Sequence, residues 1–368
     1  MKTFSTILAI LLLIAAPLGG AYLAGYSIDA YLVFPPRNIG LQPAHAPFSL
    51  PVFMVMMVAI LVVIMPFFVK VFITNKRKPS VKNSSYPFPS WGWVGFGIAI
   101  IGWVLAWTRF PWFEAWQTHT FTPLWVGYVI VINALTYMRS GRSLLTHRPG
   151  FILILFLCSA VFWWYFEYLN LFVENWYYVN VEHLGPQAFF WYATIPFATV
   201  LPAVMSTKEL LSTFPGFSAG LDNFVRLPVP YHRLMAGPLM LLAALALALS
   251  ALLTDYLYYM LWLAPLIIIV AGQVLAGKPT LFAGISRGQW KQLYLWGMAA
   301  LLCGFFWEMW NFYSYTRWEY AIPFVEGVHI FEMPLPGYAG YLPFGLQCGV
   351  VCGLIDDIVS GNKRNKVL

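Results

Sequence analysis

The stretch GFILILFLCSAVFWWYFEYLN, residues 150–170, decides the fold class of this chain. Its part Gly150–Phe166 carries no charged residue and approaches the roughly 20 residues that a helix needs to cross a bilayer. Glu167 and Asn170 then follow at its end. A carboxyl group at the end of an apolar span is costly unless it has a partner or a task, so both residues become candidates for function.

The rest of the chain shares this apolar character. Of its 368 residues, 60% are hydrophobic and 10% are charged, and the mean hydropathy is +0.71. This composition excludes a soluble globular domain and predicts an all-α, polytopic integral membrane protein with about ten transmembrane helices. The expected spans are Ile7–Tyr26, Pro51–Ile73, Trp91–Thr108, Phe121–Met138, Gly150–Phe166, Gln187–Met205, Leu234–Leu253, Leu257–Ala276, Leu293–Trp310 and Gly337–Ile355.

The positions of Lys and Arg predict the orientation of these spans. If the N-terminus lies inside, all of the 21 Lys and Arg except Arg37, Arg109 and Arg317 fall on the inner side. Because cationic loops stay on the cytoplasmic side, both termini are expected to be cytoplasmic. The net charge of +7 follows from this topology, so no nucleic-acid partner is expected.

Two features leave alternatives open. The first span, with Lys2 and small residues around Gly19–Ala24, is expected to be an uncleaved anchor, although a cleaved signal peptide fits the same pattern. The cysteines lie inside expected spans, where they are predicted to pack as small apolar residues. Cys348 and Cys352 share a helix face, which leaves a metal or redox pair as the alternative.

The motif that ends the first stretch recurs later in the chain. LYLWGMAALLCGFFWEMWN, residues 293–311, places Glu308 and Asn311 at the same offset as Glu167 and Asn170. A W-x-Y motif (residues 176–178 and 318–320), a Val-Glu pair and an [IL]-Pro-Phe motif follow in the same order in both copies. We therefore predict tandem four-helix repeats, which are parallel because four helices return the chain to the same side.

The predicted organisation has four parts. Residues 1–90 hold two N-terminal transmembrane helices and a basic cytoplasmic linker, and residues 91–206 form the first four-helix repeat. Residues 207–232 form a cytoplasmic connector, and residues 233–368 hold the second repeat and a basic C-terminal tail. Most acidic residues fall on the outer side, so a reaction centre is expected there, at the interface between the repeats.

Glu308 is the strongest candidate for a catalytic residue. Its aromatic neighbours, Trp307 and Trp310 among them, exclude water and disfavour the charged carboxylate. A carboxyl group that keeps its proton can act as a general acid, and Asn311, one turn on, is expected to orient it. Glu167 and Asn170 repeat the arrangement. The alternative is structural: each glutamate accepts hydrogen bonds and holds the outer loop to the bundle.

The second copy carries further polar residues after its W-x-Y motif. Glu332 is predicted to assist catalysis, as is Glu167 of the first copy. The residues predicted to bind the substrate are Asn170, Asn311, Trp307, Trp310, Trp318, Tyr320, Glu326 and His329. The chain has 17 Trp and 21 Tyr, an excess that an interfacial aromatic belt explains. In WFEAWQTH, ENWYY and YSYTRWEY, however, the aromatic residues crowd the outer side, as a pocket for a long apolar or cationic species requires, although packing of the outer loops gives the same pattern. A metal site that combines Glu326, His329 and Glu332 with His183 or His119 is the alternative, but no metal-binding signature is present, and neither a metal nor a cofactor is expected.

Two resemblances bear on the function. FFWEMWNFYSYTRWEY, then FEMPLPGYAGYLPFGLQC, and earlier TPLWVGYVIVINALTYMRSGRSLL resemble a group of bacterial multi-pass membrane proteins with duplicated FWExxN and W-x-Y motifs. This likeness runs from about Trp91 onward and implies a bacterial inner membrane, without a reaction. The chain is also similar to the lycopene-cyclase type of membrane carotenoid cyclase, in which an acid late in a helix precedes W-x-Y and a Pro- and Glu-containing motif. Glu308, Trp318, Tyr320, Glu332 and Pro334 hold those places here.

The second resemblance implies that acidic residues protonate a polyene and that aromatic residues shelter the carbocation without a metal. This chain departs from the pattern because FEMPL has a single Glu, which precedes the proline, and because the cyclase repeats have fewer helices. No Walker A, GxGxxG or catalytic Cys–His motif occurs, so nucleotide-driven transport is not expected.

We therefore expect an enzyme that acts on an isoprenoid or another membrane lipid by general acid chemistry. The alternatives are a lipid-binding or transport protein, or a non-catalytic scaffold with envelope-protein partners. A cavity beside Glu308 would favour the enzyme, a continuous path would favour transport, and a filled core would favour the scaffold.

Overall fold

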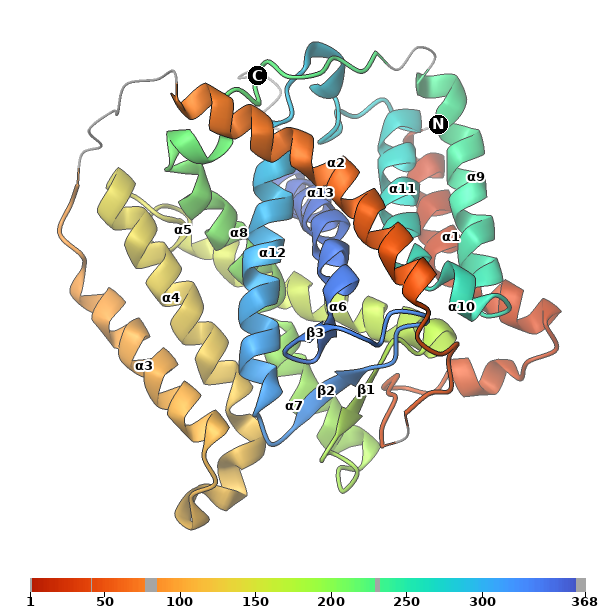
Figure 1. Ribbon diagram of the computed structural model, residues 1–368, viewed down its shortest axis with the longest axis horizontal. Coiled ribbons are helices and arrows are strands. Elements are labelled where there is room, and N and C mark those ends of the chain that lie inside the picture. The colour runs from red at the N-terminus through yellow and green to blue at the C-terminus, as the bar shows by residue number, and fades with distance from the viewer. Residues whose placement is uncertain (1, 41, 77–84, 229–231, 362–368) are drawn as a thin grey trace.

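The computed structural model describes residues 2–40, 42–76, 85–228 and 232–361, and the described chain is mostly helical (Figure 1). Nine segments of these residues are helical, long and apolar enough to cross a membrane. A further apolar helix, Met260–Leu275, is shorter. Each expected span overlaps one of these ten helical segments, so the all-α, polytopic membrane fold is confirmed.

The helices and strands follow one another along the chain with short connections. The long helices are α1 (Lys2–Leu23), α2 (Leu50–Lys76), α3 (Ser90–Trp107), α4 (Phe121–Ser140), α6 (Pro149–Val173), α7 (Pro186–Phe197), α8 (Val200–Ser212), α9 (His232–Ser250), α11 (Met260–Leu275), α12 (Lys291–Phe312) and α13 (Tyr341–Val359). Single helical turns form α5 (Leu144–His147) and α10 (Thr254–Leu257). The strands are β1 (Trp176–Val179), β2 (Arg317–Tyr320), β3 (His329–Ile330) and β4 (Met333–Pro334), and short 3₁₀ helices include η3 (Pro215–Ser218) and η5 (Leu335–Gly340).

One expected span is broken in the structure. Gln187–Met205 was predicted as a single helix, but the chain forms α7 and α8 in its place, with the break at residues 198–199, between Pro196 and Pro202. Proline lacks a backbone N–H and disfavours a continuous helix, and a break inside a membrane needs other partners for the backbone groups. Ser159 of α6 supplies them: its Oγ donates to the Phe197 carbonyl at 2.6 Å and accepts from the Leu201 N–H at 3.0 Å.

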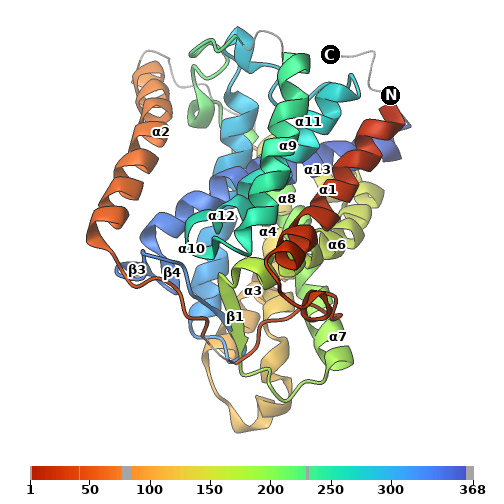
Figure 2. The same ribbon diagram turned by 90° about the vertical axis from the view of Figure 1, so that its right-hand side faces the viewer.

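The two ends of the described chain lie at the same end of the molecule. The start of α1 and the end of α13 lie there in both views, while β1 and β2 lie at the opposite end (Figures 1 and 2). We call the first the terminal end and the second the strand end. The basic residues Arg77, Lys78, Lys82, Lys363, Arg364 and Lys366, predicted to be cytoplasmic, lie outside the described residues.

At the strand end, the two W-x-Y motifs pair with each other. β1 and β2 run antiparallel, with Trp176 opposite Tyr320 and Tyr178 opposite Trp318. The tryptophan of each motif thus faces the tyrosine of the other, and Tyr177 faces Glu319 at the centre of the pair. This strand pair brings together the segments that follow α6 and α12, and the candidate site lies beside it.

Candidate functional site

Glu308 lies near the end of α12, and two tyrosines donate to it. The hydroxyl of Tyr320, in β2, donates to Oε1 at 2.8 Å, and the hydroxyl of Tyr341, the first residue of α13, donates to the same oxygen at 2.6 Å. Trp318 Nε1 in turn donates to the Tyr320 oxygen at 2.9 Å. The Glu308 side chain is 0% exposed, and its second oxygen, Oε2, is buried without a hydrogen-bond partner among the described residues.

Glu167, near the end of α6, has a related set of donors. Its Oε1 accepts from Trp163 Nε1 at 2.9 Å, from Trp176 Nε1 at 3.2 Å and from the Tyr178 hydroxyl at 2.6 Å. In both motifs, then, the tyrosine of W-x-Y donates to the buried glutamate. Burial, followed by the adjacent Glu167, raises the pKa of Tyr178, which therefore keeps its proton and remains a donor.

The asparagines of the two motifs hold backbone and not the carboxyl groups. Asn311 Nδ2 donates to the Trp318 carbonyl at 2.7 Å, and the Trp318 N–H donates back to Oδ1 at 2.9 Å. Asn170 Nδ2 likewise donates to the Trp176 carbonyl at 2.7 Å. Asn311 forms no hydrogen bond with Glu308 among the described residues, so the expected direct orientation of Glu308 by Asn311 stays a prediction.

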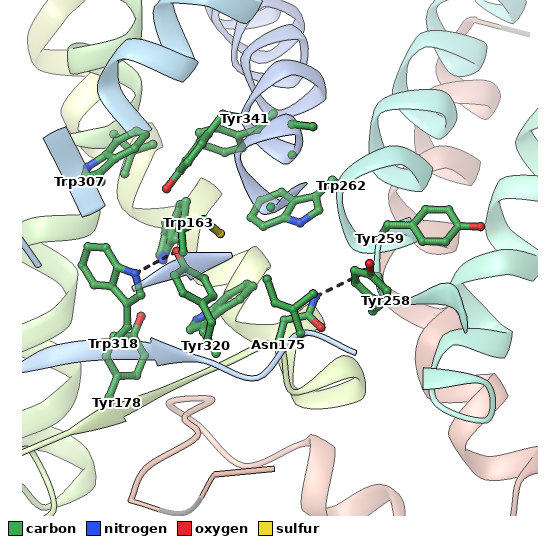
Figure 3. Close-up of a pocket in the computed structure, with 18 of the residues that line it drawn as sticks. Trp163, Asn175, Tyr178, Tyr258, Tyr259, Trp262, Trp307, Trp318, Tyr320 and Tyr341 are labelled. Atoms are coloured by element: carbon green, nitrogen blue, oxygen red, sulfur yellow. Dashed lines mark hydrogen bonds between the residues drawn. The ribbon is translucent and has the colours of Figure 1, made fainter. Parts of the chain in front are cut away.

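The tyrosines and tryptophans that bond the glutamates line a cavity of about 300 Å³. It lies between the β1–β2 pair, α7, α11, α12 and α13, and aromatic side chains point into it from several sides (Figure 3). The aromatic residues of its wall are Phe121, Trp163, Trp176, Tyr178, Phe189, Tyr192, Phe197, Tyr258, Tyr259, Trp262, Trp307, Trp318, Tyr320, Tyr341 and Phe344. Neither Glu308 nor Glu167 is part of this lining, so the hydroxyl and indole groups separate both carboxyl groups from the cavity.

Among the described residues that line the cavity, Arg317 alone carries a formal charge. One terminal nitrogen of its guanidinium, NH2, donates to Glu319 Oε1 at 2.5 Å, whereas its Nε is buried without a partner in the described part of the chain. The Tyr177 hydroxyl donates to the other Glu319 oxygen at 2.7 Å. Burial, and then the hydrogen bond to Glu319, raises the pKa of Tyr177. Arg317 of this β2 ion pair therefore lies at one side of a largely aromatic cavity, and Tyr177 of β1 bonds its partner Glu319.

The remaining polar residues of the second copy lie apart from the cavity. Glu326 accepts from the Ile322 N–H at 2.7 Å and pairs with His329 Nε2 at 2.8 Å, so both stabilise the loop after β2. Glu332 does not line the cavity either, contrary to its predicted catalytic place; burial, and then the nearby Glu319, raises its pKa. No group of three His, Cys, Asp or Glu side chains able to hold a metal occurs in the described ranges.

The two tryptophans that flank Glu308 have different places. Trp307 lines the cavity, but Trp310, predicted to bind substrate, does not. It packs in the core against Trp125, with ring centroids 5.2 Å apart, and its own Nε1 is buried without a partner among described residues. Residues three apart on a helix lie about 60° apart around its axis. Trp307 can therefore face the cavity while Trp310 faces Trp125 of α4.

The structure adds residues that the sequence reasoning missed. Tyr341 donates to Glu308 from 33 positions away, and Trp262 of α11 forms a wall of the cavity. One signal was available for Tyr341: it directly precedes the second copy of the [IL]-Pro-Phe motif, at the place that Thr194 takes in the first. For Trp262 no sequence motif marked the position.

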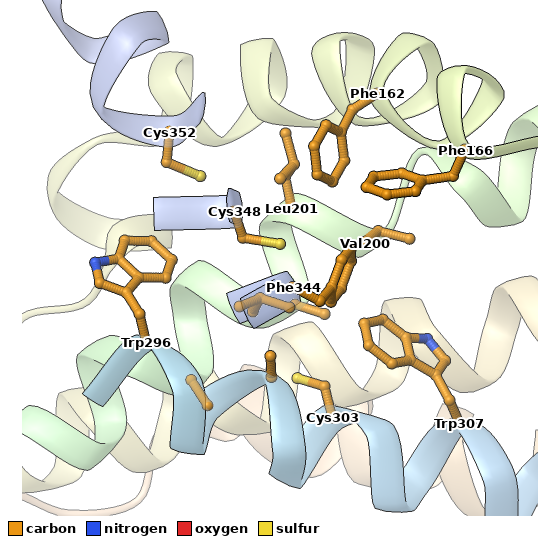
Figure 4. Close-up of a cluster of buried hydrophobic side chains, with 14 of the residues drawn as sticks. Phe162, Phe166, Val200, Leu201, Trp296, Cys303, Trp307, Phe344, Cys348 and Cys352 are labelled. Carbon is orange, nitrogen blue, oxygen red and sulfur yellow. The ribbon is translucent and has the colours of Figure 1, made fainter. Parts of the chain in front are cut away.

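Next to this cavity, the interior of the helix bundle is packed with buried side chains. Side chains from α6, α8, α12 and α13 meet there, and Phe162, Leu201, Cys303, Phe344 and Cys348 pack together (Figure 4). The four cysteines are free thiols, and Cys303, Cys348 and Cys352 are buried in or beside this cluster. This agrees with their predicted role as apolar packing residues.

Fold and site together describe a polytopic membrane protein with an aromatic cavity backed by two buried glutamates. Comparison of the chain with protein-family models, with curated proteins and with solved structures finds no match.

Proposed function

We propose that this protein binds an isoprenoid or another lipid chain in the aromatic cavity and acts on it by general acid chemistry. The observation that carries the proposal is the pair of tyrosines, Tyr320 and Tyr341, whose rings line the cavity while their hydroxyls bond Glu308 behind the wall. The cavity would admit an apolar chain, and the glutamate would supply the proton.

The proton would pass from Glu308 through a tyrosine to the ligand. When Oε1 of Glu308 carries a proton, its hydrogen bond with Tyr341 reverses and the Tyr341 hydroxyl proton turns toward the cavity. Glu308 then gives its proton to the Tyr341 oxygen while the Tyr341 hydroxyl proton moves to a carbon–carbon double bond of the ligand. The carboxylate and a carbocation result, and loss of a proton from the carbocation restores the balance. Aromatic faces stabilise a cation, and the wall of this cavity offers many of them.

Helix α2 suggests how a lipid would reach the cavity. Met56 and Ile60 of α2 line it, and only 6% of the most apolar part of α2 is buried in the protein. In Figure 2 α2 stands at the edge of the molecule. A ligand dissolved in the bilayer could therefore enter beside α2 without crossing water.

The cavity beside Glu308, together with the packed cluster behind it, favours this proposal over the alternatives. Transport would need a path through the bundle, and the cluster around Phe344 and Cys348 occupies the space between the cavity and the terminal end. A scaffold would need no cavity. The membrane is inferred to be a bacterial inner membrane with the terminal end in the cytoplasm, because cationic loops stay on that side.

The test is to purify the full chain in nanodiscs made from its own membrane and identify the retained lipids by mass spectrometry. We expect the wild type to enrich a lipid with an unsaturated chain together with its product. Tyr341→Phe and Glu308→Gln should each shift the ratio toward the unconverted lipid, since loss of a general acid costs about 10²–10⁴ in rate.

Tyr258→Phe is the matched control. Tyr258 also lines the cavity, but within the described part of the chain its hydroxyl has only the Met56 sulfur as a hydrogen-bond partner, at 3.7 Å, and not a glutamate. It should keep the wild-type ratio. The same lipid in unchanged form in all samples would leave lipid binding without catalysis, and no selective lipid in the wild type would refute the proposal.

A further inference from the structure

A second cavity, of about 360 Å³, lies on the other side of the bundle from the strand pair, where the chain passes from α4 through α5 to α6. Its lining residues come from that turn and from the last part of α8: Arg142, Ser143, Leu144, His147, Arg148, Met205, Lys208 and Glu209. Three of the eight are Lys or Arg and one is His. We call it the basic pocket; it shares no lining residue with the aromatic cavity.

The positive charges of the basic pocket are only partly neutralised by the protein. Arg148 bonds Asp356 of α13 and packs over the Phe151 ring, with 4.1 Å between Cζ and the ring centroid. Arg142 and Lys208 form no salt bridge among the described residues, and Glu209 is the only acid in the lining. The basic pocket therefore carries a net positive charge when no ligand is bound.

The surroundings of Lys208 hold it in place. Its ammonium lies 5.7 Å from the centroid of the Trp296 ring of α12, and the residue is half-buried between helices. A cation held in this way differs from a topology-determining lysine in an open loop, because its side chain has already lost part of its freedom and faces a defined space. An anion that enters would meet Arg142 from the connection between α4 and α5, and Lys208 from α8.

We propose that the basic pocket binds a phosphate group, either in the headgroup of an anionic phospholipid or on a soluble molecule. Basic pockets between transmembrane helices at the cytoplasmic surface are suited to lipid phosphates, and the predicted topology places this end of α8 at that surface. Arg142 and Lys208 would contact the phosphate oxygens, and Arg148 would add charge while it remains bonded to Asp356. Glu209 would oppose binding by repulsion.

The lipid arm uses the full chain in nanodiscs of phosphatidylcholine mixed with phosphatidylglycerol, with the retained lipids counted by native mass spectrometry. The wild type should retain phosphatidylglycerol preferentially. Arg142→Gln and Lys208→Gln should each lower that preference about fivefold, because one cation near an anionic headgroup contributes about a factor of five. Glu209→Gln should raise it. Arg226→Gln, which removes an exposed cation of the loop before α9, is the control and should change nothing.

The soluble arm uses nanodiscs of phosphatidylcholine alone and compares thermal unfolding in inorganic phosphate and in chloride at equal ionic strength. Stabilisation by phosphate that is lost in Lys208→Gln, without phosphatidylglycerol preference, would assign the pocket to a soluble phosphate-bearing molecule. Absence of both effects in the wild type would overturn the proposal. So would a preference that Glu209→Gln leaves unchanged, a result that stays informative even if the cation variants fail to fold.

Discussion

At the scale of the residue, the two glutamates illustrate how a carboxyl group is accommodated inside a membrane protein. Glu308 and Glu167 are 0% and 1% exposed, and each receives its hydrogen bonds from aromatic side chains and not from Lys or Arg. Such bonds satisfy one carboxyl oxygen while the rings keep water out. The second carboxyl oxygen of Glu308, Oε2, is buried without a hydrogen-bond partner among the described residues.

Asn311, the asparagine of the second motif, is predicted to stabilise the folded protein. Asn311→Ala should lower the free energy of unfolding by about 1–3 kcal/mol, because the Trp318 N–H and carbonyl would lose the partner that satisfies both of them. Thermal unfolding in nanodiscs, followed by tryptophan fluorescence, measures the change. Asn223→Ala, in an exposed turn, should have little effect. Equal melting temperatures for the two variants would contradict the backbone-holding role of Asn311.

Glu332 is predicted to make the stability of the folded protein depend on pH. Burial, and then the nearby Glu319, raises its pKa in the folded protein. A carboxyl group with a raised pKa binds its proton more tightly in the folded state, so its contribution is fully favourable below the ordinary pKa of glutamate. That contribution is lost as the pH rises through the folded-state value.

The variant Glu332→Gln should therefore melt at a higher temperature than the wild type near neutral pH and at the same temperature in acid. Glu326→Gln is the opposite control, because it would lose a carboxylate that bonds the Ile322 N–H and His329, and it should melt lower at neutral pH. A Glu332→Gln variant that is less stable than the wild type at neutral pH would contradict the assignment.

At the scale of the element, close packing of α12 and α13 positions the cavity wall. A Cβ atom added at Gly345 of α13 would lie 2.3 Å from the Trp296 carbonyl oxygen of α12, and one added at Gly304 of α12 would lie 2.4 Å from the Tyr341 ring. Small residues allow two membrane helices to approach in this way. The same approach brings Tyr341 within reach of Glu308.

The close contact of α12 and α13 predicts how a methyl group added at a glycine of α13 changes the stability of the protein. Gly345→Ala should destabilise the protein by about 1–3 kcal/mol through overpacking, because its Cβ meets helix backbone that has little room to move. Gly353→Ala, in the same helix with nothing within 4 Å of the added Cβ, should be neutral or slightly stabilising. Both are measured by thermal unfolding in nanodiscs. If Gly345→Ala matched Gly353→Ala, the two helices would be further apart than the structure has them.

At the scale of the whole molecule, the β1–β2 pair joins the segments that follow the two glutamate helices. Because Trp176 faces Tyr320 and Tyr178 faces Trp318, the pair has approximate twofold symmetry, as two copies of one ancestral unit would produce. The duplication itself and the four-part division of the chain remain predictions. What the pairing adds is a physical link between the donors of Glu167 and those of Glu308.

The orientation in the membrane gives the last prediction. We expect a membrane-impermeant maleimide, added to intact cells or spheroplasts, to label Glu114→Cys, in the exposed connection after α3, and not Ser286→Cys, in the exposed connection before α12. Permeabilisation should expose both. The parent chain, whose own cysteines lie within helices, gives the background. Labelling in the reverse order would place the aromatic cavity on the cytoplasmic side.

Most of the helices could be predicted from the sequence because the cost of placing polar groups in a bilayer acts on each segment separately. The exception is the break between α7 and α8. Pro196 was visible in the sequence, but the break depends on Ser159 of α6, which holds the freed backbone groups. A local pattern cannot show whether such a partner is present.

The sequence by itself determined the membrane class, the spans and the glutamates to which a function could be assigned, since hydropathy and repeated motifs are properties of neighbouring residues. Only the tertiary structure decided which groups face the cavity. It placed Glu308 behind Tyr320 and Tyr341, turned Asn311 to the backbone and removed Trp310, Glu326, His329 and Glu332 from the cavity wall. These outcomes depend on contacts between helices far apart in the chain, whose geometry is set by packing and not by sequence spacing.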